Sequence, residues 1–109
     1  MLHPFAIDVL SRDNDNIAGV SWGFSIWVAL RKTGRYSVGA TCTTNEPPTP
    51  RFRIHYPLKT GAEVWDAIND LYSSIDENEP ALELEDWREV VSVLTTHDPL
   101  LAAQVWDAA

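Results

Sequence analysis

Apolar and polar residues alternate along the first half of the chain, a pattern typical of β-strands whose two faces meet different surroundings. Residues 5–10 carry three apolar side chains on one side, and we expect a strand there that can join a sheet. The polar run from Arg12 to Asn16 comes next. It predicts a turn, because Asn and Asp side chains bond to their own backbone and tolerate left-handed conformations.

Residues 20–44 predict a long β-hairpin, and the composition of its turn fixes the register. A three-residue loop of Lys32, Thr33 and Gly34, with Gly34 left-handed, pairs apolar residues on one face of the hairpin. These pairs are Leu30 with Tyr36, Val28 with Val38, Ile26 with Ala40 and Phe24 with Cys42. On the other face Trp27 then lies opposite Gly39, with its ring over bare backbone. A two-residue loop would set apolar residues opposite polar ones, so the first register is favoured.

A further strand is expected at about residues 51–57, after a stiff, proline-rich loop at residues 45–50. Alternation places its side chains on two faces. Phe52, Ile54 and Tyr56 share one face, while Arg51, Arg53 and His55 share the other.

The second half of the chain has helical spacing. Thr60 and Glu63 form a capping-box pattern at the start of a first helix, which residues 76–80 end. Asp86 with Glu89 predicts a second cap, and that helix ends near Thr96 or His97. Asp98 followed by Pro99 predicts the start of a third helix. The inward stripes are Val64, Ile68, Leu71, Tyr72 and Ile75, then Trp87, Val90, Val91 and Leu94, then Leu101 and Val105.

Together these elements predict a single α+β domain over residues 1–109. Its antiparallel sheet has three or four strands: the hairpin at about 20–44, the strand at about 51–57, and the possible strand at 5–10. Three C-terminal helices follow and pack on one face of the sheet, and the other face meets solvent. A chain of 109 residues is long enough to bury a core without metals or disulfides.

The single cysteine, Cys42, excludes an intramolecular disulfide, and its register places it among apolar neighbours on the covered face. The first residues lack the pattern of a signal peptide, and no apolar run is long enough for a membrane span. We therefore expect a cytoplasmic protein without a membrane role. Five tryptophans are many for this length, and they either fill the core or include anchors for a partner.

The net charge of −8 is distributed unevenly along the chain. Residues 1–59 carry seven Lys and Arg against four Asp and Glu, which gives a net charge of +3. Residues 60–109 carry twelve Asp and Glu against Arg88 alone, which gives −11. Like charges at this density repel each other, so a basic partner would bring a benefit that offsets their cost.

No set of residues has the pattern of a catalytic, metal or cofactor site. His97 with Asp98 is more simply a helix end followed by a helix cap. The Asp13–Asn16 segment lacks the glycine and the later glutamate of a calcium loop. Metal-ligand spacings and phosphate-binding loops are also missing from the sequence. We therefore expect a protein that is not an enzyme and needs no metal or cofactor.

Two candidate binding surfaces follow. The acidic helical surface consists of Glu63, Asp66, Asp70, Asp76, Glu77, Glu79, Glu83, Glu85 and Glu89. The open sheet face consists of Trp27, Arg31, Arg35, Arg51 and Arg53, with His55 as a further candidate.

The leading hypothesis is a non-enzymatic inhibitor whose acidic helical surface occupies the basic site of a nucleic-acid-handling protein. Anti-CRISPR proteins, nuclease immunity proteins and other DNA mimics resemble this chain as a class, being small, acidic and without motifs. The alternative is a binding module whose open sheet face takes single-stranded nucleic acid or an acidic protein. The net charge weighs against general nucleic-acid binding. A third hypothesis is a homodimer or larger homo-oligomer that pairs the two surfaces.

Overall fold

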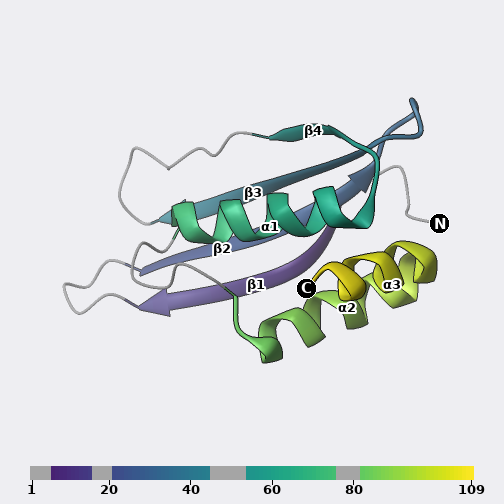
Figure 1. Ribbon diagram of the computed structural model, residues 1–109. Coiled ribbons are helices and arrows are strands. Elements are labelled where there is room, and N and C mark those ends of the chain that lie inside the picture. Colours follow the sequence, from purple (N-terminus) through teal and green to yellow (C-terminus); the bar gives the residue numbers. More distant parts are fainter. Residues whose placement is uncertain (1–5, 16–20, 45–53, 76–81) are drawn as a thin grey trace.

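The computed structural model describes residues 6–15, 21–44, 54–75 and 82–109, and its elements are arranged as Figure 1 shows. The strands are β1 Ile7–Asp15, β2 Ser21–Leu30, β3 Tyr36–Thr44 and β4 His55–Leu58. The helices are α1 Gly61–Ile75, α2 Leu84–His97 and α3 Pro99–Ala108. The four strands form one antiparallel sheet in the order β1-β2-β3-β4, which confirms the predicted α+β fold.

The β2–β3 hairpin has the predicted register throughout. Leu30 pairs with Tyr36, and the ladder continues from there to the far ends of both strands. Gly34 has a φ of 80°, a left-handed value that favours glycine, and its N–H donates to the Arg31 carbonyl at 2.9 Å. The glycine therefore sets the turn, and the turn sets which side chains face the helices.

Strand β1 is longer than the sequence predicts. It pairs with β2 from Ile7 to Asp15, so the turn expected from Arg12 is wrong for the residues up to Asp15. Ser11 and Ser25 face each other across this ladder, with their hydroxyl oxygens 3.0 Å apart. Continued pairing satisfies the backbone of the polar segment, and this outweighs the local preference of Asp and Asn for turns.

Strand β4 is short, and its faces are the reverse of the prediction. Tyr36 pairs with Leu58 and Val38 with His55, so β4 contains one more residue than the part of β3 that it opposes. This bulge places His55 and Leu58 on the helix-covered side. The expectation that His55 joins the open face is therefore wrong. The predicted positions 51–53 of this strand lie outside the described residues.

Two of the three predicted helix starts are confirmed. The Glu63 N–H donates to Thr60 Oγ1 at 3.2 Å, and the Leu101 N–H donates to Asp98 Oδ1 at 3.2 Å. Helix α2, however, begins at Leu84, and the N–H of Glu83 donates to Asp86 Oδ2 at 3.2 Å. The cap expected from Asp86 with Glu89 is therefore wrong, because Asp86 lies inside the first turn and closes it from there.

The helices cover one face of the sheet. Helix α1 runs along the sheet and packs against β2, β3 and β4, helix α2 lies on β1, and α3 packs against both helices (Figure 1). The fully buried side chains between these layers are mostly those of the predicted stripes, including Ile26, Val28, Val38, Val64, Ile68, Val90, Leu94, Leu101 and Val105. None of the helices in the described ranges is long and apolar enough to cross a membrane.

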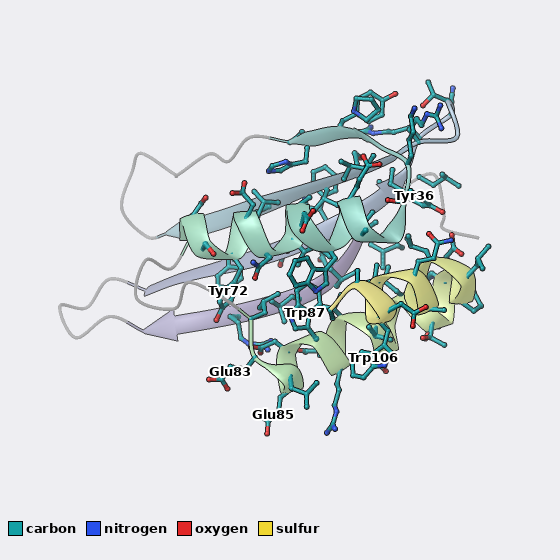
Figure 2. The ribbon with its side chains drawn as sticks, in the orientation of Figure 1. Tyr36, Tyr72, Glu83, Glu85, Trp87 and Trp106 are labelled. Atoms are coloured by element: carbon teal, nitrogen blue, oxygen red, sulfur yellow. The ribbon has the colours of Figure 1, made fainter. Side chains whose placement is uncertain are left out.

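Side-chain contacts tie the helical layer to the sheet. The Tyr36 hydroxyl donates to Asp98 Oδ2 at 3.2 Å, which links β3 to the junction of α2 and α3. Burial raises the pKa of the Tyr36 phenol, and the negative charge of Asp98 adds to the rise. Trp65 of α1 and Trp87 of α2 stack with their ring centroids 5.3 Å apart, so the buried Trp87 belongs to the interior and the half-buried Trp65 packs against it. Figure 2 shows Trp87 directed between the helices.

Candidate acidic cleft between β4 and α1

Three of the predicted acidic side chains project from helix α1. Glu63, Asp66 and Asp70 are exposed and follow three- and four-residue spacing, so they span about 10 Å along one side of the helix. The buried stripe of Val64, Ile68 and Leu71 holds this helix on the sheet and so fixes where the carboxylates point.

These carboxylates line a cleft between helix α1 and the edge strand β4. One hollow, of about 450 Å³, is bordered by residues Ile54 to Leu58 of the strand side and by Asp70, Leu71 and Ser74 of the helix. An adjoining hollow of about 300 Å³ is bordered by His55 and Leu58 together with the α1 carboxylates and Ala67. The two hollows share His55, Leu58 and Asp70, and we call them together the β4–α1 cleft.

His55 connects the two walls of the cleft. Its Nε2 lies 3.1 Å from Asp70 Oδ2, and the Asp70 side chain is still 64% exposed. Within the described residues, neither Glu63 nor Asp66 forms an ion pair. The cleft therefore presents carboxylates that the described part of the protein does not neutralise with Lys or Arg.

The acidic residues of helix α2 have a different environment. Glu89 Oε2 and Asp86 Oδ1 each lie 2.7 Å from Arg12 Nη2, so β1 supplies a cation to this helix. The hydrogen bond to Glu89 raises the pKa of the Arg12 guanidinium, and the bond to Asp86 acts in the same direction. Glu83 and Glu85 are exposed and point away from the body of the protein (Figure 2).

The described acidic residues thus fall into two groups. Helix α1 carries one group beside β4, and helix α2 carries the other beside β1, at the opposite edge of the sheet. Three predicted members, Asp76, Glu77 and Glu79, lie outside the described residues. The α1 group is the better candidate site, because Arg12 already partners Glu89 in the α2 group.

The open sheet face contains part of the alternative site. Trp27 is half-buried opposite Gly39, as predicted, while Arg31 and Arg35 are exposed at the end of the hairpin. The remaining members, Arg51 and Arg53, lie outside the described residues.

Replacing Gly39 with alanine is expected to lower the free energy of unfolding by about 1–2 kcal/mol. A Cβ at this position would lie 2.6 Å from Cε2 and 2.8 Å from Cη2 of the Trp27 ring, and it would also meet Cζ2. Urea denaturation followed by circular dichroism measures the change. In a Trp27→Ala background the same substitution should cost much less, and equal costs in the two backgrounds would show that the ring does not lie there.

Sequence reasoning missed the strand wall of the cleft. Ile54 and Tyr56 are 49% and 48% exposed, although they were expected on the apolar face of their strand. The pattern that could have identified them is the pair of apolar residues flanking His55, followed by Pro57, which cannot donate to a sheet ladder. The Tyr56 side chain is directed towards the hairpin end, where its hydroxyl lies 2.9 Å from Thr33 Oγ1, so Leu58 and Ala67 are the apolar residues beside the carboxylates.

The other described residues considered for catalysis or metal binding have structural roles in the fold or are not grouped into a site. Asp98 accepts hydrogen bonds from the Leu101 N–H and the Tyr36 hydroxyl, so it acts as a cap and as a link between layers. Among the described residues, no three His, Cys, Asp or Glu side chains are grouped so that they could hold a metal ion. Cys42 pairs with Phe24 in the ladder, and its side chain lies outside the described part.

Comparisons with known proteins give no match. No protein-family model matches the chain, and neither a curated protein nor a solved structure is similar to it at a significant level.

Proposed function

We propose that this protein is a non-enzymatic inhibitor that binds a basic, nucleic-acid-handling protein through the β4–α1 cleft. The observation that carries the proposal is the row of exposed carboxylates, Glu63, Asp66 and Asp70, on a helix that packs on the sheet. Lys and Arg side chains that normally grip phosphates would pair with these carboxylates instead.

The energetics of such an interface favour the α1 group. Forming an ion pair with a partner protein costs less free energy when the carboxylate does not first have to break an ion pair within its own chain. This condition holds for Glu63 and Asp66 within the described residues. Close charge pairs across an interface contribute on the order of 1.5–7 kcal/mol and speed association at low salt. Leu58 and Ala67 add apolar surface next to the charges. Occupation of the partner's basic site would then exclude nucleic acid directly.

The double charge reversal Asp66→Lys with Asp70→Lys is expected to weaken binding to the partner by at least about tenfold, which corresponds to about 1.4 kcal/mol. The partner is first identified by affinity capture from nuclease-treated lysate followed by mass spectrometry. Its affinity for each variant is then measured by calorimetry, and its nucleic-acid binding in the presence of each variant by gel mobility shift.

A matched control separates the site from the overall charge. Glu85→Lys with Asp107→Lys changes the net charge equally, at exposed positions outside the cleft. This control should bind and inhibit like the wild type. Equal loss in both double variants would indicate that only total charge matters, and unchanged affinity in the α1 variant would rule out the inhibitory cleft.

A further inference from the structure

We infer that the end of the β2–β3 hairpin is a second binding surface, which recognises an acidic segment of a partner protein. This hairpin-tip surface consists of Arg31, Lys32, Arg35, Tyr56 and Lys59. All five side chains are exposed. Lys59 follows Leu58, the ladder partner of Tyr36, and this brings it beside Arg35. The surface shares only Tyr56 with the β4–α1 cleft, so the inference does not depend on the proposed inhibition.

Arg31 is held in position by contacts from two other strands. Its Nε donates to Ser37 Oγ of β3 at 3.0 Å, and Ser37 is completely buried. Its guanidinium carbon lies 6.0 Å from the centre of the Tyr56 ring, within the range of a cation–π contact. The Tyr56 hydroxyl is in turn 2.9 Å from Thr33 Oγ1 in the hairpin turn. The side chain of Arg31 is therefore fixed before any ligand arrives, which lowers the entropy lost on binding.

Within the described residues, no hydrogen bond or ion pair uses the terminal nitrogens of Arg31. Only Nε is used by Ser37, and no ion pair of Arg31 occurs within the described part of the chain. The two Nη groups form a planar fork that matches the two oxygens of a carboxylate. Lys32, Arg35 and Lys59 add three cations around this fork, so the surface suits a segment that bears several negative charges.

An acidic protein segment fits this surface better than single-stranded nucleic acid does. Base recognition without sequence preference relies on free aromatic faces, on which successive bases stack. Here the Tyr56 ring is engaged by Arg31, and the Trp27 ring lies against the backbone at Gly39. A long polyanion would also extend past the tip towards a protein with net charge −8, whose repulsion is screened only beyond about 8 Å at physiological salt. A short acidic segment avoids both difficulties.

The test is a titration of the ¹⁵N-labelled protein with a short oligoglutamate peptide, followed by NMR, with a short oligothymidylate as a parallel probe. We expect the peptide to shift the amide signals of residues 31–35 and 59, and the affinity to fall about tenfold in Arg31→Gln. Arg31→Lys should recover only part of it, because the ammonium group lacks the planar fork. Arg88→Gln, which removes an exposed arginine of α2, is the matched control and should bind like the wild type.

A second variant keeps the test independent of folding. Lys32→Gln with Arg35→Gln changes exposed side chains without touching the Ser37 contact, and it should also weaken peptide binding. The inference is overturned if the peptide causes no shifts at the tip, if Arg88→Gln weakens binding as much as Arg31→Gln, or if oligothymidylate binds there more tightly than the peptide.

Discussion

Replacing Trp87 with alanine is expected to lower the free energy of unfolding by about 3–5 kcal/mol. Trp87 is 5% exposed and stacks on Trp65 with an angle of 16° between the ring planes. The pair joins α2 to α1, and the two helices otherwise meet through α3, which packs against both. Removing the indole leaves a cavity between the helices and also strips one face of Trp65. Guanidinium denaturation followed by far-ultraviolet circular dichroism measures the loss.

Trp106 provides the matched control for this substitution. It lies on α3, is 42% exposed and has no stacking partner among the described aromatic pairs, so Trp106→Ala should cost about 1 kcal/mol or less. Trp87→Phe should fall between the two alanine variants, because it keeps part of the ring contact. If the two alanine variants lost equal stability, the interior role of Trp87 would be disproved, and Trp87 would instead become a candidate anchor for a partner.

The hairpin could be predicted from the sequence because two independent constraints agree there. A glycine at the third position of the loop permits the left-handed residue that the turn needs, and Gly34 has that conformation. The same loop pairs apolar residues along the whole ladder, whereas a shift of one residue would expose them. The helix stripes were predictable for a similar reason, since Val64, Ile68 and Leu71 repeat at helical spacing and are all buried.

Strand β1 and the faces of β4 could not be predicted because their causes are remote or irregular. Arg12 finds its carboxylate partners 74 and 77 residues further along the chain, at Asp86 and Glu89. A local polar run therefore gave no sign that the strand continues. In β4, one extra residue between the pairs of His55 and Leu58 breaks the alternation on which the prediction of faces relied.

The candidate site was predictable on one wall only. Helical spacing places Glu63, Asp66 and Asp70 on one side of α1 without any tertiary information. The opposite wall depends on which strand occupies the sheet edge and on which way His55 points. The prediction from the sequence also grouped the acidic residues of both helices into one surface. In the structure, α1 and α2 lie over opposite edges of the sheet. Charge reversal within the α1 group is therefore a sharper test than a general reduction of acidity.

Replacing Gly61 with alanine is expected to lower the free energy of unfolding by about 2–3 kcal/mol. Gly61 is the first residue of α1 and is buried against α3, where its N–H donates to Gln104 Oε1 at 3.0 Å. A Cβ on Gly61 would lie 2.6 Å from the carbonyl carbon of Gln104 and 2.7 Å from the nitrogen of Val105, and it would also meet the Gln104 Cβ. Two of these atoms belong to the backbone of α3, so a change of side-chain rotamer cannot relieve the contact. Thermal and urea denaturation measure the loss.

Gly34→Ala separates this steric effect from the general consequence of replacing a glycine. Nothing lies within 4 Å of a Cβ at Gly34, so that substitution carries only the cost of a left-handed residue, roughly 1 kcal/mol. Alanine is the better helix former by about 1 kcal/mol, so a net loss at Gly61 has to come from separating α1 and α3. Gln104→Ala should not rescue Gly61→Ala, because the opposing backbone atoms remain. A Gly61→Ala variant as stable as the wild type would show that the two helices do not approach this closely, and the position of the Glu63 carboxylate in the cleft would then need revision.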